Sequence, residues 1–376
     1  MLELTDRAAC LAWLATPGRP PAALRALDVR DLAVFASDDF GDCLFLSCRL
    51  TDQQAGHLTE SGATVLRDDP ARPYTAHRAQ LYTPAELFAG FDPTDPVSGW
   101  TSTLDHTIYR WCQAHGAAQP DSIAESLAQR LHDHSIAESL DEVLADRRPV
   151  AVMGGHAVVR RSPHYAQVAG IARELTADGF TLLSGGGPGA MEATHLGAWM
   201  AAAEPTDLAA ALDLLGRRAA GSPDGGEYLD ADWLHRAFAV RGRWPGGAGN
   251  PSIGIPTWVY GHEPPAAFAG QIAKYFANSV REEGLLALAT HGVIFTPGSA
   301  GTVQEIFQDA AQNHYASYGP ASPMVLLGRD YWTRELPVWA VLQALAARRD
   351  YRDLIVLTDD PVEAAAVIRG YERSAP

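Results

Sequence analysis

Two glycine-rich segments point most directly to chemistry in this 376-residue sequence. The first, TLLSGGGPGAMEATHLGA at 181–198, leads from an apolar strand-like stretch through four glycines into a helix-forming stretch. Glycines leave backbone N–H groups uncovered around an anion, and the N-terminus of the following helix adds partial positive charge. The residues that we expect to bind a ligand here are Ser184, Gly185, Gly186, Gly187, Gly189, Met191 and Glu192.

A second segment, GVIFTPGSAGTVQEIFQDA at 292–310, repeats this design. If the two loops follow neighbouring parallel strands, both face one crevice at the carboxyl edge of the sheet. One such loop alone is equally well explained as a tight turn without a ligand, but two of the same design favour ligand binding. The residues that we expect to bind here are Pro297, Gly298, Ser299, Ala300, Gly301 and Thr302, joined by Gly154, Gly155 and His156 from the first turn of the same sheet.

Neither segment is a dinucleotide fingerprint or a triphosphate-binding loop. The fingerprint needs G-x-G-x-x-G in the first strand–helix turn, and the phosphate loop ends in Gly-Lys-Ser or Gly-Lys-Thr. The first turn here reads Gly-Gly-His at 154–156, and Lys274 is the only lysine of the chain. The two loops therefore predict an anion site of another kind.

At these residues the sequence resembles the LOG family of nucleoside-monophosphate phosphoribohydrolases, whose members are often mislabelled lysine decarboxylases. The resemblance rests on GGGPGAMEA at 185–193 and PGSAGTVQE at 297–305, and it spans roughly 148–360. The strings GGH at 154–156 and HGVIF at 291–295 are closer to the larger bacterial nucleotide 5′-monophosphate nucleosidases, which carry an additional N-terminal domain. Departures from the family pattern are Ser299, in place of a glycine, and Gln304, in place of a common glutamate. In addition, Arg281 lies one residue farther from the proline than the family spacing, and Glu282 stands where a lysine or arginine often follows.

The resemblance implies a hydrolase that cleaves the N-glycosidic bond of a nucleoside 5′-monophosphate such as AMP, releasing the base and ribose 5-phosphate. It implies no cofactor and no metal, and it implies a homodimer or higher homo-oligomer that pairs through helices near the site. The strings GQIAKYFANSV at 270–280 and EIFQDAAQNHY at 305–315 are candidates for those helices.

The family's catalytic pair is the glutamate that ends the second motif and an arginine on the preceding helix, which implies Glu305 and Arg281 here. Cleavage builds positive charge on the ribose, and a carboxylate beneath the sugar can stabilise that charge and orient water. Glu305 follows Thr302 by three residues, close enough to reach a ribose whose phosphate the loop holds. Two other interpretations stay open: Glu305 as a first-turn carboxylate that favours the helix dipole, and Arg281 as half of a surface ion pair.

Several further residues have two interpretations each. Glu192 either contacts ribose hydroxyls or caps its own helix, and His156 and Tyr165 are more often packing residues than ligands. Aromatic faces can stack on a base, but a core or interface role is as well supported for the residues that follow a predicted strand end. These residues are Trp258, Tyr260 and His262.

Two other functions compete with hydrolysis. Lysine decarboxylation needs pyridoxal phosphate on a lysine Schiff base, and Lys274 is the only candidate. We expect that lysine to be exposed on an amphipathic helix over 271–276. The second competitor is a nucleotide-binding sensor or carrier that holds its ligand without cutting it.

From residue 148 the sequence alternates strands and helices, which predicts a Rossmann-like, doubly wound parallel sheet in an α/β catalytic domain over 148–376. The long interval at about 204–250 passes through Gly221 to Gly226 and Trp244 to Gly249, which are rich in glycine and proline, and it predicts an insertion or lid beside the carboxyl edge of the sheet, with partial disorder. The expected strands are Val150 to Met153, Thr181 to Ser184, Ser252 to Thr257, Gly292 to Thr296, Pro323 to Leu327 and Leu354 to Leu357.

Residues 1–147 predict a smaller N-terminal domain of mixed α/β structure followed by helices. We expect strands at Leu32 to Phe35, Cys43 to Cys48 and Ala63 to Leu66, a helix from Thr51, and a helical stretch from Thr103 to Asp146. The string SIAESL occurs twice in that stretch, at 122–127 and 135–140. Either a helix starts at each copy, or one helix carries a chance echo.

Composition limits the partners and the compartment. The net charge of −16 disfavours nucleic acid, because such binders need clustered cations. No apolar run is long enough to cross a bilayer and no leader-like start is present, so a cytoplasmic protein is expected. Cysteines 10, 43, 48 and 112 fit buried free thiols better than a zinc site completed by His132 or His134.

Overall fold

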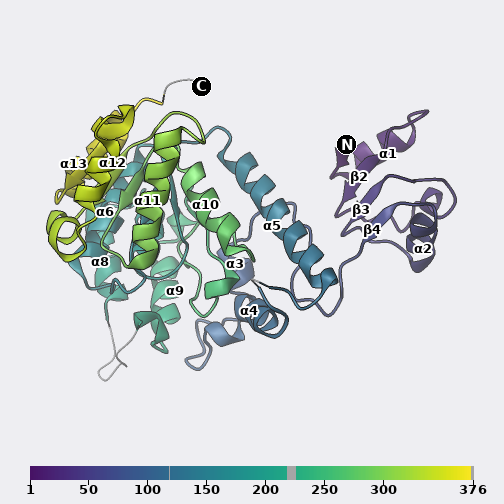
Figure 1. The fold of residues 1–376 in the computed structure, drawn as a ribbon. Coiled ribbons are helices and arrows are strands. Elements are labelled where there is room, and N and C mark those ends of the chain that lie inside the picture. Colours follow the sequence, from purple (N-terminus) through teal and green to yellow (C-terminus); the bar gives the residue numbers. More distant parts are fainter. Residues whose placement is uncertain (118, 218–225, 374–376) are drawn as a thin grey trace. The chain divides into compact units, whose positions relative to one another are not determined.

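The computed structural model describes residues 1–117, 119–217 and 226–373 (Figure 1). The chain divides into a smaller compact unit, residues 1–81 and 111–139, and a larger unit, residues 82–110 and 140–376. We expected one boundary near residue 147, but residues 82–110 belong to the larger unit. The physical reason is pairing within that unit: Tyr82 bridges Ile272, and Asp105 forms an ion pair with Lys274.

The smaller unit contains a four-stranded parallel sheet in the order β1-β2-β3-β4. A capping box between Thr51 and Gln54 starts its helix α2, at the predicted position. The elements are β1 (Leu2–Leu4), α1 (Arg7–Leu14), β2 (Ala22–Arg25), β3 (Leu44–Leu46), α2 (Asp52–Glu60) and β4 (Thr64–Leu66).

One strand predicted for this unit is wrong. The run from Leu32 to Phe35 is not a strand, and a short 3₁₀ helix covers Ala33–Ala36 instead. Phe35 is fully buried against the rings of Phe40 and Phe45, so the apolar run supplies the core without joining the sheet. Strands β1 and β2 were not predicted.

Helices α4 (Leu104–His115) and α5 (Ile123–Leu144) follow, each crossing from one unit into the other. Only the first copy of SIAESL starts a helix, because the Ser122 hydroxyl accepts the Glu125 N–H at 3.1 Å. The second copy lies inside α5, where the Ser135 hydroxyl donates to the His132 carbonyl. The two copies therefore lie in one continuous helix, and the second copy is a chance repeat.

The larger unit is built on a seven-stranded parallel sheet in the order β11-β10-β9-β5-β6-β7-β8. This is a Rossmann-like α/β fold, as predicted. Strand β5 lies between β6 and β9, so the direction of strand addition reverses there, and ligands bind at such switch points. The strands are β5 (Pro149–Met153), β6 (Thr181–Ser184), β7 (Ile253–Gly254), β8 (Gln271–Ile272), β9 (Val293–Phe295), β10 (Met324–Leu327) and β11 (Ile355–Thr358).

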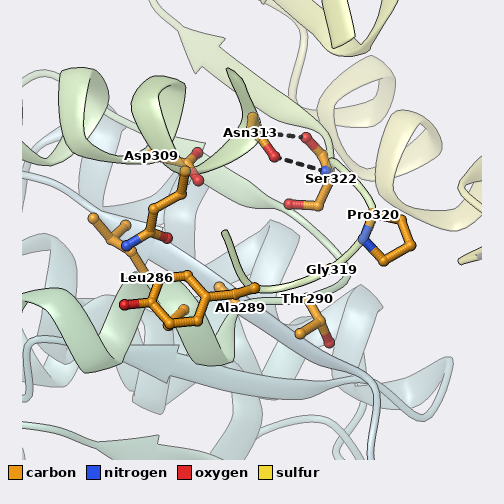
Figure 2. Close-up of a pocket in the computed structure, with 11 residues that line it drawn as sticks. Leu286, Ala289, Thr290, Asp309, Asn313, Gly319, Pro320 and Ser322 are labelled. Atoms are coloured by element: carbon orange, nitrogen blue, oxygen red, sulfur yellow. Dashed lines mark hydrogen bonds between the residues drawn. The ribbon is translucent and has the colours of Figure 1, made fainter. Parts of the chain in front are cut away.

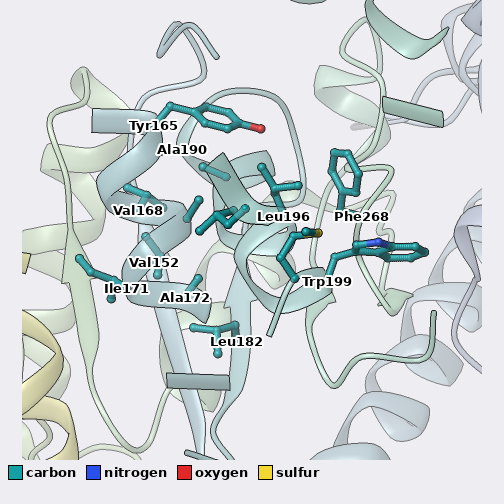
Figure 3. Close-up of a cluster of buried hydrophobic side chains, with 14 of the residues drawn as sticks. Val152, Tyr165, Val168, Ile171, Ala172, Leu182, Ala190, Leu196, Trp199 and Phe268 are labelled. Atoms are coloured by element: carbon teal, nitrogen blue, oxygen red, sulfur yellow. The ribbon is translucent and has the colours of Figure 1, made fainter. Parts of the chain in front are cut away.

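Helices flank this sheet, and α10 and α11 lie side by side (Figure 1). Helices α6 and α7 pack most closely, because Gly197 brings its backbone against Ala169. Figure 3 shows the apolar core between these two helices and the strands. The helices are α3 (Pro84–Leu87), α6 (Pro163–Ala177), α7 (Ala190–Trp199), α8 (Pro205–Leu215), α9 (Trp233–Arg243), α10 (Asn278–Leu288), α11 (Ala300–Tyr315), α12 (Trp339–Ala346) and α13 (Pro361–Gly370).

The segment 271–276 differs from its prediction. It begins with β8 rather than forming a helix, and α10 begins only at Asn278. Lys274 is buried, not exposed: its Nζ donates to Asp105 Oδ1 at 2.6 Å and lies 5.3 Å from the Trp258 ring centroid. The run from Ile272 to Phe276 is buried throughout, and periodicity alone cannot separate a strand from a helix over so short a run.

The predicted insertion is helical where it is described, in α8 and α9, with a 3₁₀ turn at Glu227–Leu229. Most of the stretch from Gly221 to Gly226, where we expected disorder, lies outside the described residues. All four cysteines are buried and none is in a disulfide, and no group of three or more His, Cys, Asp or Glu side chains among the described residues could hold a metal. No helix in the described ranges has both the length and the apolar character that a membrane span needs.

Candidate functional site

A cavity of about 360 Å³ lies at the carboxyl ends of β5, β6 and β9, where the two glycine loops meet. Both predicted loops contribute to it, as do the turn after β5 and the predicted pair Arg281 and Glu305. The predicted residues that line it are Gly154, Gly155, His156, Gly185, Gly186, Gly187, Met191, Arg281, Ser299, Gly301, Thr302 and Glu305. The others are Tyr228, Pro256, Thr257, Tyr260, His262, Glu263 and Glu282.

Backbone hydrogen bonds hold the three loops together. The Gly155 N–H donates to the Pro297 carbonyl at 3.1 Å, and the Gly155 carbonyl accepts the Ala190 N–H at 3.2 Å. The first glycine loop requires glycine at residue 186, where φ is +71° and a Cβ would lie 2.7 Å from Pro256 Cδ. The shape of the cavity therefore depends on the absence of side chains at its floor.

A fully buried chain of side-chain hydrogen bonds fixes the start of the first glycine loop. Ser184 Oγ lies 2.8 Å from His195 Nε2, and His195 Nδ1 lies 2.9 Å from Ser252 Oγ. Burial lowers the pKa of His195 to about 3, so its ring is neutral at physiological pH. The Gly186 N–H donates to Ser184 Oγ at 3.1 Å. Ser184 thus shapes the loop but does not line the cavity.

The second loop leads directly into α11, whose first turn faces the cavity. Ser299 precedes the helix with extended backbone, and Gly301 and Thr302 line the cavity from the first turn. N–H groups at a helix start have no partner within the helix, so they are available to an anion. A phosphate at this end of the cavity would meet both these groups and the positive end of α11.

Glu305 projects into the cavity one turn into α11. Burial raises the pKa of its carboxyl to about 7, while the Arg281 guanidinium acts in the opposite direction and Glu282 adds to the increase. A carboxyl with a pKa near neutrality can give up and take back a proton at physiological pH, which suits a general base.

Arg281 lies beneath the first glycine loop rather than on the surface. Its side chain is 8% exposed, its Nε donates to the Ile255 carbonyl at 2.7 Å, and its Nη2 donates to the Gly185 carbonyl at 3.4 Å. The surface ion pair that the sequence left open is therefore wrong. Arg281 connects α10 to the loops after β6 and β7 while its charge faces the cavity.

Glu263 is a third carboxyl in the cavity, beside Glu305 and Glu282, and sequence reasoning missed it. It follows the 3₁₀ turn Trp258–Tyr260. Tyr260 at the end of this turn and His262 just after it are residues that the sequence suggested for base stacking. Tyr260 and His262 do line the cavity, whereas Trp258 is buried against Phe276. The signal for Glu263 in the sequence was its position directly after His262, in a segment that the sequence had already suggested for the site.

Glu192 does not reach the cavity, so the predicted contact with ribose hydroxyls is wrong. Its carboxylate is fully buried and accepts hydrogen bonds from Arg160 Nε at 2.8 Å, Arg160 Nη2 at 2.5 Å and the Tyr165 hydroxyl at 2.8 Å. Nor does it cap its helix. Tyr165 is a packing residue, as the alternative had it.

The other predicted residues outside the lining act through the backbone. Gly189 is the residue before α7 and has φ of +70°. The Pro297 carbonyl accepts from Gly155, the Gly298 carbonyl accepts from the Tyr331 hydroxyl, and Ala300 opens α11. These residues fix the geometry of the loops around the cavity.

A smaller cavity of about 30 Å³ lies between α10 and α11 (Figure 2). Asp309, one turn beyond Glu305, lines it with a carboxylate oxygen that has no hydrogen-bond partner among the described residues, and the same holds for the Gln312 side-chain nitrogen. Asn313 instead pairs with the backbone of Ser322. Burial raises the pKa of Asp309 to about 8.

Fold and site together define an α/β protein with a Rossmann-like parallel sheet and, at its switch point, a cavity lined by three glutamates and an arginine. No family model matches the chain, and no curated protein matches it. Among solved structures, a molybdenum cofactor binding protein from the phototrophic bacterium Rippkaea orientalis is similar, with 16% sequence identity and a TM-score of 0.36. The match covers 60% of this chain and 96% of that protein.

Proposed function

We propose that the larger unit binds a nucleoside 5′-monophosphate and hydrolyses the bond between its base and its ribose. The observation that carries this proposal is the convergence of two glycine loops, Glu305 and Arg281 on one cavity of about 360 Å³. That volume falls within the usual range for small-molecule sites.

The order of groups along the cavity supports this substrate class. The phosphate would lie at the first turn of α11, beside Gly301 and Thr302. The ribose would then lie against Glu305, one helical turn further on. The base would occupy the remaining space near Tyr228 and Tyr260, whose rings can stack on it.

The chemistry follows from the charge that develops. As the bond between the ribose carbon and the base nitrogen breaks, its electron pair leaves with the base and positive charge grows on the sugar. The Glu305 carboxylate would stabilise that charge and take a proton from the attacking water. Arg281 would lower the pKa of Glu305, so that a fraction of the protein molecules carry the ionised carboxylate at neutral pH. Its guanidinium would also provide positive charge for the phosphate.

The alternative of decarboxylation on Lys274 has little support. The lysine amine is buried in an ion pair with Asp105, and Lys274 does not line the cavity. A pyridoxal phosphate Schiff base would need that amine to be free and neutral.

Hydrolysis is tested by incubating the purified protein with a panel of ribonucleoside monophosphates and measuring the released base by chromatography. We expect release of the base from at least one monophosphate and none from the matching nucleoside, because the phosphate group would make most of the binding contacts. Glu305→Gln should abolish release, whereas the exposed control Glu335→Gln should leave it unchanged. Binding of a monophosphate without release would instead favour a nucleotide sensor or carrier.

We further propose that copies of the chain associate through α10 and α11. Val280 on α10 is 47% exposed, Tyr315 on α11 is 77% exposed, and Tyr318 just beyond α11 is 47% exposed. Exposed apolar side chains grouped on neighbouring elements are typical of association surfaces. Sedimentation of the wild-type protein and of Tyr315→Glu tests this, since the substitution should favour the monomer.

A further inference from the structure

Glu263 lines the cavity together with Glu305 and Glu282, and it has no role in the proposed hydrolysis. Its backbone N–H donates to the Tyr260 carbonyl at 3.1 Å, which closes the turn and directs the side chain to the cavity. The side chain is 15% exposed. A carboxyl this enclosed is costly to keep ionised unless it has close partners.

The surroundings of Glu263 leave its oxygens available to a ligand. His156 Nδ1 lies 3.9 Å away and His262 Nε2 lies 4.0 Å away, both beyond hydrogen-bond distance. A Cβ at Gly187 would lie 3.1 Å from Oε2, so the carboxyl is placed over the first glycine loop. Among the described residues no side chain or backbone N–H within hydrogen-bond distance donates to it.

The charges around Glu263 oppose one another. Burial raises the pKa of its carboxyl, whereas His156, His262, Arg281 and Lys274 act to lower it. Burial raises the pKa of the Tyr228 phenol, and the negative charge of the Glu263 carboxyl adds to the increase. The balance favours a carboxyl that holds a proton more readily than an exposed glutamate does.

The proposed reaction needs such a proton. A departing purine or pyrimidine anion is a poor leaving group, and a proton placed on the base as the bond breaks converts it into a neutral molecule. Arg281 cannot supply the proton, because a guanidinium does not deprotonate in proteins. Its Nε and Nη2 also face the carbonyls of Ile255 and Gly185.

We propose that Glu263 is the general acid that protonates the departing base, in a role that rests on the proposed hydrolysis. The proton moves from the Glu263 carboxyl to a ring nitrogen of the base while the electron pair of the glycosidic bond goes to the base. Water adds its oxygen to the ribose carbon and gives a proton to Glu305. One water is consumed, and exchange with solvent restores both carboxyls.

The test compares two substrates that differ in their need for an acid. Release of guanine from guanosine 5′-monophosphate requires protonation, whereas 7-methylguanosine 5′-monophosphate already carries a positive charge on the base and leaves without it. Glu263→Gln, which preserves shape, should lower kcat for the first by about 100-fold or more and change the second by less than about fivefold. Glu305→Gln should lower both, and Glu335→Gln neither.

The pH profile of the wild-type protein gives a second readout that does not depend on a variant. With guanosine 5′-monophosphate, kcat/KM should fall on the alkaline side as the acid loses its proton, and with the methylated substrate that decline should be absent. Equal loss for both substrates in Glu263→Gln, no loss for either, or an alkaline decline shared by both would overturn the role of Glu263 alone. A wild-type protein that releases neither base would remove the proposed hydrolysis itself.

Discussion

Arg281 Nε donates a 2.7 Å hydrogen bond to the carbonyl of Ile255, and this bond fixes α10 to the chain that leaves β7. The same guanidinium reaches the carbonyl of Gly185 in the first glycine loop. One side chain therefore sets the distance between the helix that precedes β9 and the loop that follows β6. Its role is as much to position the loop as to provide charge.

We expect Arg281→Lys to be nearly as harmful as Arg281→Ala. An ammonium cannot reproduce two hydrogen bonds in the fixed directions of a guanidinium. Base release should fall by about 100-fold in both variants, as a loss of kcat/KM in steady-state assays. Arg334→Ala, at an exposed arginine, is the matched control. Full activity in Arg281→Lys would show that charge alone is needed.

The pKa of Glu305 predicts how activity depends on pH. The carboxyl has a pKa of about 7, raised by burial, and its ionised form is the one that acts. With 7-methylguanosine 5′-monophosphate, which needs no general acid, activity should therefore rise with pH through about 7 and level off above it. Because Arg281 lowers this pKa, Arg281→Ala should move the midpoint to higher pH. The measurement is kcat/KM from pH 5 to 9, and an unchanged midpoint in the variant would contradict the electrostatic link.

The first glycine loop should not tolerate a side chain at residue 186. Gly186→Ala would force a left-handed backbone on alanine and place its Cβ 2.7 Å from Pro256 Cδ. We expect a loss of about 1–3 kcal/mol in the free energy of unfolding and weaker monophosphate binding by calorimetry. Gly284→Ala in α10, where a Cβ meets nothing within 4 Å, should be neutral or stabilising.

Asp309 predicts that stability falls as pH rises. Its pKa is about 8 in the folded chain against an ordinary value of 3.8, so the folded state holds a proton that the unfolded state has lost. Between about pH 4 and pH 8 the free energy of unfolding should decline with pH for this reason. Asp309→Asn removes the cause.

Denaturant titrations at pH 5 and pH 8.5 check this. The variant should gain stability relative to wild type at the higher pH, by on the order of 3 kcal/mol. Asp330→Asn, at an exposed position, should show no such difference. Identical pH dependence in wild type and Asp309→Asn would mean that the small cavity between α10 and α11 does not keep the carboxyl neutral.

The sheet of the larger unit was largely predictable, because buried parallel strands are short apolar runs between turn residues. The strand at Thr181–Ser184 has the predicted bounds. Four of the other five expected strands differ from the observed ones by a single residue, at one end or at both ends. The segment Ser252 to Thr257 gave only a two-residue strand, since Pro256, which has no N–H, interrupts the pairing, and a single bridge from Thr257 to Tyr275 follows it. Local patterns were sufficient where the strand is central and insufficient at the edge β7-β8.

The cavity residues were predictable where they lie in the glycine loops and unpredictable where tertiary packing brings them in. Gly185 and Thr302 line it as expected. Glu263 and Tyr228 come from irregular segments that no motif marks. Glu192 failed for the opposite reason, because a carboxylate inside a recognisable motif serves a buried arginine, Arg160. A sequence motif identifies the segment that matters but not the direction of each side chain.

The central place of β5 has a consequence for synthesis of the chain. Its two neighbours, β6 and β9, are separated by more than one hundred residues in sequence, and the helix that bears Glu305 follows the later one. A nascent chain that has just completed β6 and its glycine loop therefore lacks the second glycine loop and Glu305 of the proposed anion site. Nucleotide capture by ribosome-bound chains of increasing length would report when the whole sheet has assembled.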